Sequence, residues 1–263
     1  MTTLSVCIVT KNEEHNIEQT LQTIGFADEI IIVDSYSSDA TVQICKKYTN
    51  KIYLNTWQGC GIQKKLALEK ASCDWVLILD ADERLSVELQ QEIQTMLKTP
   101  SKYSGFIIPF QTFYLGKAIK YGDWINEQHL RLFKRTQGEI IANYVHFGLE
   151  VSGNIGVLSN KILHYSFPNI ESILHKINNY SSLGAKDKLK AGKTASIFTA
   201  ILHGLFTFIR GYIFRFGFLD GKYGFMLAIS NAEGAYYKYL KLMFLALNEQ
   251  LLDQAERSEQ TNQ

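Results

Sequence analysis

The residues best suited to chemistry are Asp80 and Asp82, two carboxylates one residue apart at the end of the apolar run Trp75–Leu79. A short run with no polar member is typical of a strand buried on both faces. Ligands gather beyond the C-terminal ends of strands in an open parallel sheet, so this pair suits a hard divalent cation that also holds phosphate oxygens. The alternative is structural: Asp82, Glu83 and Ser86 would open and cap the next helix.

Polar residues also follow two earlier strand-like runs. Thr10-Lys11-Asn12-Glu13 ends the first run, and Asp34 ends the second. Three polar ends on one edge of a sheet favour a ligand crevice over three separate helix caps, and Asp34 would accept hydrogen bonds from a base or a ribose. Lys64 follows a glycine-flanked turn at an expected helix start. It would meet a diphosphate there, or else belong to a solvated helix face.

The elements that position these residues alternate along the first hundred positions. This alternation predicts right-handed crossovers and a mainly parallel, Rossmann-like α/β sheet. Residues 103–165 are rich in aromatic and β-branched side chains with turn signals, which predicts mixed strands and loops. From Pro168 the pattern is helical. The predicted strands are Leu4–Val9, Glu29–Val33, Lys51–Leu54 and Trp75–Leu79, and the predicted helices are Glu13–Ile24, Asp39–Tyr48, Gly61–Ala71 and Ser86–Leu97.

Composition narrows the class of protein. The chain of 263 residues is 46% hydrophobic and 20% charged, which allows a sizeable core. Its net charge of +1 argues against a general nucleic-acid binder. The four cysteines form no metal-type pair, which predicts reduced thiols in a cytoplasmic protein. We expect no signal peptide, and no helix that clearly spans a membrane, because no apolar run reaches about 18 residues.

The C-terminal part of the chain is basic and aromatic. Residues 165–247 hold ten Lys or Arg and four Asp or Glu, and they include the stretches SIFTAILHGLFTFI and YYKYLKLMFLAL. Apolar faces with interspersed cations suit helices that lie in a membrane interface and attract anionic headgroups. The alternatives are a helical subdomain packed on the sheet and an oligomer interface.

Three blocks in this order and spacing, VCIVTKNEEHNIEQTL, IIVDSYSSDAT and LILDADE, resemble the start of a family 2 glycosyltransferase with the GT-A fold. The likeness continues through LRLFKR and LHY and covers most of residues 1–165. It is similar to the branch that builds lipopolysaccharide core or related bacterial surface glycans. The resemblance implies that Thr10, Glu13 and Asp34 hold the nucleotide. It also implies that Asp80 and Asp82 form the DxD pair, with Asp82 the better candidate for direct contact with Mg²⁺ or Mn²⁺.

The resemblance also suggests the remaining roles. Relatives place an acid before the RLF strand, where this chain has Glu127, our candidate general base. Others have His-Glu where this chain has His146-Phe147, a departure that leaves Glu150 as a second candidate. His164 is a candidate metal ligand or a structural histidine, and Arg131 is a candidate phosphate contact.

These inferences predict residues 1–165 as the catalytic domain, with a nucleotide-binding half at 1–100 and an acceptor half at 101–165. Residues 166–252 would be a basic helical region and residues 253–263 a polar tail. The expected protein is a metal-dependent, inverting hexosyltransferase that moves a sugar from a UDP-sugar to a lipid-linked bacterial glycan, at the inner face of the cytoplasmic membrane. The alternatives are a nucleotidyltransferase, which should carry a glycine-rich basic loop instead of Thr10-Lys11-Asn12-Glu13, and a non-catalytic membrane-docking protein.

Overall fold

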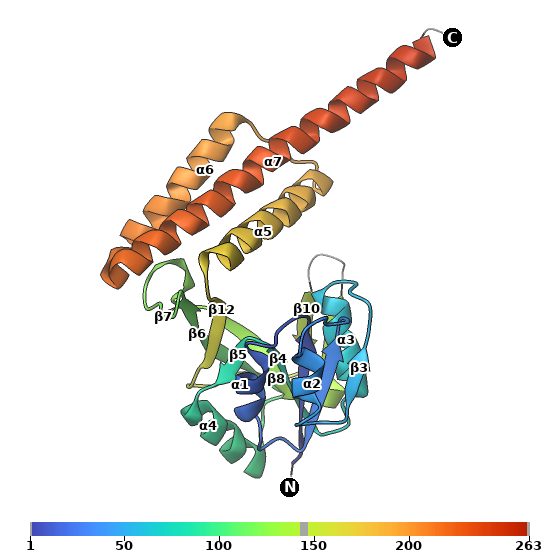
Figure 1. Ribbon diagram of the computed structural model, residues 1–263, viewed down its shortest axis with the longest axis vertical. Coiled ribbons are helices and arrows are strands. Elements are labelled where there is room, and N and C mark those ends of the chain that lie inside the picture. Colours follow the sequence, from blue (N-terminus) through green and yellow to red (C-terminus); the bar gives the residue numbers. More distant parts are fainter. Residues whose placement is uncertain (1, 143–146, 262–263) are drawn as a thin grey trace. The chain divides into compact units, whose positions relative to one another are not determined.

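Parallel strands form the centre of the first half of the chain (Figure 1) in a computed structural model that describes residues 2–142 and 147–261. Each strand is parallel to its neighbour. Their apolar runs are buried because helices cover both faces, as the unbroken runs predicted. The strand predictions are confirmed to within one residue at each end. In spatial order the strands are β3 (Ile52–Leu54), β2 (Glu29–Asp34), β1 (Leu4–Thr10) and β4 (Trp75–Asp80).

Helices separate these strands and build a core on each face of the sheet. Leu4, Val6 and Ile8 of β1 pack into one core, and Cys7 between them packs into the other. This alternation follows from the period of two residues in a strand. The first two helices are shorter than predicted: residues 14–16 form a turn in which the Asn16 N–H donates to the Glu13 oxygen, and the second helix ends at Cys45. The helices are α1 (Ile17–Gln22), α2 (Thr41–Cys45), α3 (Cys60–Lys70) and α4 (Val87–Lys98).

Antiparallel strands extend the sheet beyond β4, which confirms the predicted mixed region. β8 (Gln128–Lys134) is antiparallel to β4, and β6 (Gly105–Tyr114) is antiparallel to β8. β12 (Ile162–Phe167) and the short β5 (Glu83–Leu85) follow in the sheet order. The remaining strands are β11 (Ile155–Val157) and β7 (Lys117–Ala118), which pair with β6, and β9 (Gly138–Ala142) and β10 (Phe147–Val151), which form a hairpin.

Contacts divide the chain into two compact units. Unit 1 comprises Met1–Thr112 and Asn126–Ser166, and unit 2 comprises Phe113–Ile125 and Phe167–Gln263. Residues 113–125 therefore pack with the C-terminal helices, although the chain on both sides of them belongs to unit 1. As assignments of function, the ranges 1–165 and 166–252 remain predictions.

Unit 2 is a layer of helices in which α5 (Ile170–Lys190) and α6 (Ile197–Ile209) both pack against α7 (Gly221–Thr261). Helix α6 approaches α7 closely at Gly204, where an added Cβ would lie 3.2 Å from the Cβ of Tyr236. A π-helix (Arg210–Phe214) and a 3-10 turn (Gly217–Asp220) connect α6 to α7. Asp123, in the 3-10 turn Gly122–Trp124, anchors this connection through ion pairs of 3.0 Å with Arg210 and with Arg215.

One helical stretch departs from the expectation that no helix clearly spans a membrane. Ile197–Phe214 is 18 residues long and, by length and composition alone, is sufficient to cross a bilayer. The stretch is this long because α6 continues into the π-helix, and it is apolar because Arg210 is its one charged residue. A single helix of this kind is weak evidence for a membrane span, but little of this one is buried within the protein.

Candidate active site

The three polar strand ends meet at one edge of the sheet, in the arrangement that the sequence predicts. Thr10 is the pairing partner of Asp34, and Val9, beside Thr10, is the partner of Asp80. The C-terminal ends of β1, β2 and β4 therefore lie side by side, so their polar residues face the same region of unit 1.

Asp34 is fully buried at the end of β2. Its carboxylate accepts hydrogen bonds from the Thr10 hydroxyl at 2.7 Å and from the Ser37 backbone N–H at 2.8 Å. Glu13, in the turn after β1, accepts a hydrogen bond from the Asn16 amide at 3.0 Å, and its backbone N–H donates to the Thr41 hydroxyl at 2.8 Å. These bonds hold the two loops that follow β1 and β2 in fixed conformations.

Asp80 belongs to a network of buried charges. Lys64 Nζ lies 2.7 Å from one carboxylate oxygen of Asp80, and Arg131 Nη2 lies 3.2 Å from the other. Burial opposes ionisation, but the charges of Lys64 and Arg131 outweigh it and hold the pKa of Asp80 well below its ordinary value. The Asp80 side chain is 31% exposed whereas that of Lys64 is 2% exposed, so Asp80 is the member of the pair that a ligand reaches.

Glu83 is the residue whose importance the sequence did not show. It is fully buried in β5, where it accepts hydrogen bonds from Arg131 Nη2 at 2.5 Å and from the Asp80 backbone N–H at 2.9 Å. Burial raises the pKa of Glu83 above its ordinary value, and Arg131 opposes that shift. The alternative in which Asp82 and Glu83 open a helix is wrong: α4 starts at Val87, and Ser86 caps it by accepting from the Leu89 N–H. The sequence feature that could have indicated this role of Glu83 is its position as a third acidic residue, directly after Asp80 and Asp82.

Asp82 and His164 form the arrangement most compatible with a metal. Asp82 Oδ2 lies 3.6 Å from His164 Nε2, and the Asp82 backbone oxygen accepts a hydrogen bond from Tyr165 N–H at 2.9 Å. His164 Nδ1 is buried and has no hydrogen-bond partner among the described residues. Burial lowers the pKa of His164, but the Asp82 carboxylate outweighs it, so the net shift is upward.

These two side chains fit a divalent cation in part. Within residues 2–142 and 147–261, no group of three or more His, Cys, Asp or Glu is placed to hold a metal ion. The chain would thus supply a carboxylate oxygen and an imidazole nitrogen, and oxygens of a bound substrate would have to complete the coordination, as is usual for Mg²⁺ with phosphates. The imidazole nitrogen that would share the cation with Asp82 is Nε2, because it is the one that faces the Asp82 carboxylate.

The two candidate bases have different environments. Glu127, directly before β8, accepts a hydrogen bond from the Thr112 hydroxyl at 2.8 Å and lies 3.3 Å from His129 Nε2. Burial opposes ionisation, but the hydrogen bonds from His129 and Thr112 lower the pKa of Glu127. Glu150 is exposed in the β9–β10 hairpin, opposite Glu139, and no contact among the described residues joins it to Asp80 or Asp82. His146 lies outside the described residues.

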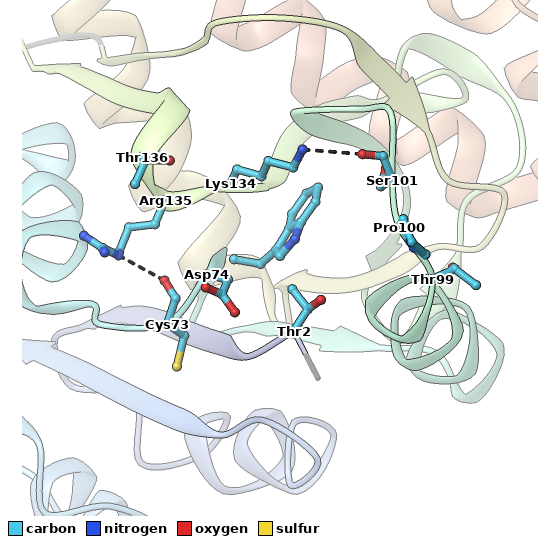
Figure 2. A pocket seen from close by; sticks show the side chains of 10 residues that line it. Thr2, Cys73, Asp74, Thr99, Pro100, Ser101, Lys134, Arg135 and Thr136 are labelled. Carbon is cyan, nitrogen blue, oxygen red and sulfur yellow. Dashed lines mark hydrogen bonds between the residues drawn. The ribbon is translucent and has the colours of Figure 1, made fainter.

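A hollow at the opposite edge of unit 1 is a different feature. It has a volume of about 390 Å³ and lies beside Trp75, the first residue of β4, whereas Asp80 is the last. Figure 2 shows two of its cations bonded to backbone oxygens, Lys134 to Ser101 at 3.4 Å and Arg135 to Cys73 at 3.0 Å. Because β4 separates the hollow from the strand-end carboxylates, it is not part of the candidate active site.

Comparisons with known proteins agree with the motifs at the sheet edge. A model of glycosyl transferase family 2 matches residues 5–147. An uncharacterized glycosyltransferase of Rickettsia typhi is 32% identical over 94% of this chain and 89% of its own length. The lipopolysaccharide core biosynthesis glycosyltransferase LpsC of Rhizobium meliloti is 29% identical over 91% of each chain.

Solved structures include similar chains. Glucosyl-3-phosphoglycerate synthase from Mycobacterium tuberculosis, solved with Mg²⁺ and UDP, has a TM-score of 0.43 and is 17% identical, over 64% of this chain and 73% of that chain. The family match covers more than half of the chain, and the similarity to the Rickettsia relative extends over nearly all of it. The chain belongs to glycosyl transferase family 2.

Proposed function

We infer that this family 2 glycosyltransferase is a metal-dependent, inverting enzyme that transfers a sugar from a nucleotide-sugar to a bacterial glycan. The acceptor would be lipopolysaccharide core or another lipid-linked glycan, the class that the name of the Rhizobium relative indicates. The observation that carries the proposal is the position of Asp80, Asp82 and His164, together at the C-terminal edge of the sheet and next to the buried charges of Lys64 and Arg131.

In this proposal the donor binds across the strand ends. Thr10, Glu13 and Asp34 hold the nucleoside, and the rigid hydrogen bonding between Thr10 and Asp34 fixes that wall of the site. The diphosphate meets Asp80, with Lys64 and Arg131 directly behind it. When both acids are ionised, Lys64 and Arg131 balance Asp80 and Glu83, so this network adds no net charge to oppose a diphosphate.

Asp82 and His164 would hold the Mg²⁺ or Mn²⁺ ion. A bound divalent cation neutralises the negative charge that develops on the diphosphate as the sugar leaves. The role of the chain is to hold its ligands still. The Asp82 backbone is bonded to Tyr165 of β12, the strand that also carries His164, so both candidate ligands are fixed to the same pair of elements.

Glu127 would act as the general base. An acceptor hydroxyl must lose a proton as it attacks the anomeric carbon from the face opposite the diphosphate, and a carboxylate within hydrogen-bond reach accepts that proton. The lowered pKa of Glu127 keeps it ionised at neutral pH, which is the state the role requires. Attack from the opposite face inverts the configuration of the sugar.

Unit 2 would attach the enzyme to the inner face of the cytoplasmic membrane. Helix α6 carries no charged residue, and its outer face leaves Phe198 73% and Leu202 64% exposed. Large exposed apolar surfaces mark interaction sites, and exposed lysines such as Lys186 and Lys190 on α5 would add attraction to anionic lipid. A position at the membrane would suit an acceptor that is anchored there.

Calorimetric titration of UDP, with Mn²⁺ and with EDTA, tests this proposal. Binding should require the metal, because Asp82 adds negative charge where the diphosphate must lie. The variant Asp82→Ala should lose transfer to an extracted lipopolysaccharide core acceptor and keep the circular dichroism and melting temperature of the wild type. Equal UDP affinity with and without metal, or normal turnover of the variant, would exclude the metal-bridged mechanism.

A further inference from the structure

Two hollows open into the helical layer of unit 2, and both are lined by residues of that unit alone. The first has a volume of about 250 Å³ and lies between α5, α7 and the segment that carries Tyr114 and Trp124. The second, of about 490 Å³, lies between α6 and α7. Trp124, Asn231 and Lys238 line both, so the two hollows adjoin.

The first hollow is mainly apolar. The Trp124 and Phe167 rings stack in its wall with centroids 4.9 Å apart, and Ile173 and Ile177 of α5 complete that side. The hydroxyl of Tyr114 is satisfied by Ser230 at 2.8 Å. Lys176, Asn231 and Lys238 also line the hollow, but the stacked rings and the isoleucines form a continuous apolar side, which favours a hydrocarbon chain over a sugar there.

The second hollow is cationic. Lys238 and Arg210 line it, and the stem of Lys238 lies against Gly184 of α5, where an added Cβ would come within 2.9 Å of the lysine Cδ. His203 stacks on Tyr239 with ring centroids 3.8 Å apart. Burial lowers the pKa of His203, and the charges of Lys238 and Lys188 lower it further. The one acid in the lining, Asp123, is paired with both Arg210 and Arg215.

We propose that the adjoining hollows of unit 2 bind one anionic lipid, with its phosphate beside Lys238 and its hydrocarbon chain against Trp124 and Phe167. Charge complementarity identifies the headgroup, and the apolar wall identifies the chain. The inference rests on the proposed function in one respect: it takes this lipid to be the membrane anchor of the glycan acceptor. In the sequence, Glu127, the candidate base, follows Trp124 of the hollow by three residues.

Titration with dihexanoyl phosphatidic acid, kept monomeric, tests the site on the full-length protein. We expect saturable binding at least tenfold tighter than that of inorganic phosphate or of neutral dihexanoylglycerol, since each of these lacks half of the ligand. Lys238→Gln should weaken binding about tenfold by removing a charged partner of the phosphate. Gly234→Leu should abolish binding by filling the first hollow, where an added Cβ meets no atom within 4 Å. Leucine favours a helix, so this variant should fold.

Lys193→Gln, at an exposed lysine that follows α5 and lies outside both hollows, is the matched control and should bind as the wild type does. Inorganic phosphate or the neutral lipid binding as tightly as phosphatidic acid would overturn the proposal. So would unchanged binding in both pocket variants, or an equal loss in the control. Asp82→Ala should keep lipid binding. If transfer fails in every assay while this pattern holds, the proposed function is wrong and the lipid site stands.

Discussion

Unit 1 buries charges, whereas unit 2 exposes apolar side chains. In unit 1, Arg131 and Glu83 form an ion pair that is almost closed to solvent. In unit 2, Phe198 and Phe214 are 73% and 68% exposed. Both arrangements are costly for an isolated protein in water, because a buried charge loses hydration and an exposed aromatic ring orders solvent.

The two costs have different explanations. The charges of unit 1 gather at one sheet edge, where perturbed ionisation is useful to an enzyme. The apolar residues of unit 2 extend over α6 and its connection to α7, where they suit an apolar partner. Substitutions in unit 1 should therefore change stability and turnover, while those on the surface of unit 2 should change attachment.

The largest effect is expected for Arg131→Met, which leaves Glu83 and Asp80 without their shared cation. Breaking a buried ion pair on one side costs about 3–5 kcal/mol, so the free energy of unfolding measured in guanidinium chloride should fall by that amount. Arg135→Met, which removes a largely exposed cation of the next turn, should cost less than about 1 kcal/mol. Equal losses in the two variants would show that water already solvates the buried network.

A second buried charge should make unit 1 sensitive to acid. Burial favours the neutral form of Glu29, but hydrogen bonds from Lys51, Ser5 and Ser72 lower its pKa from 4.5 to about 2. A lowered folded-state pKa gives stability that is present above the unfolded value and is lost as the pH falls through the folded one. Between pH 5 and pH 2 the free energy of unfolding should thus drop by about 3 kcal/mol from this group.

Glu29→Gln tests that assignment. The variant should be less stable than the wild type at pH 7, and the difference should shrink as the pH falls toward 2. A constant difference over this window would mean that the ionisation of Glu29 contributes nothing to the acid sensitivity.

Turnover measurements on variants distinguish the two candidate bases, Glu127 and Glu150. Glu127→Gln should lower turnover about 10²-fold, with little effect on UDP affinity, because general-base assistance has that magnitude. Glu150→Gln, the matched acid in the exposed hairpin, should stay near the wild type. If Glu150→Gln is the impaired variant, the roles of the two residues are exchanged.

The smallest effect is expected for the paired substitutions Phe198→Ser and Leu202→Ser on α6. Each removes about 1 kcal/mol of membrane attachment if half of the side chain enters the bilayer, so binding to anionic vesicles should weaken roughly thirtyfold in flotation assays. The free energy of unfolding should hardly change, since both side chains are exposed. Val157→Ser, an exposed apolar residue of unit 1, should not affect flotation. Equal binding by the paired variant would favour an oligomer interface on α6.

Local sequence determined most of the fold but little of the charge network. The runs of β1, β2 and β4 are apolar and end in polar residues, so their limits were predictable to one residue. The partners of Arg131 lie 51 and 48 positions away, at Asp80 and Glu83, and no local pattern encodes such pairs. Strand β5 was missed because its three residues follow the DxD pair without an apolar run.

The basic tail illustrates the same limit. Its excess of Lys and Arg was plain, yet the sequence could not show that Arg210 and Arg215 are committed to Asp123. Nor could it show that Lys241 is held by α5 through Asn178 and Ser181. Charge reversal at these positions would therefore disturb packing within unit 2 as well as any attraction to lipid.

The insertion of residues 113–125 has a consequence for how such a gene is able to evolve. Three chain crossings connect the two units, and Asp123 and Trp124 of the insertion have their partners after residue 166. Recombination at a single point after residue 166 would replace those partners and leave the old insertion behind. A new helical layer can thus be acquired only together with a matching insertion, so the two segments should be inherited as one block even though the sequence of unit 1 separates them.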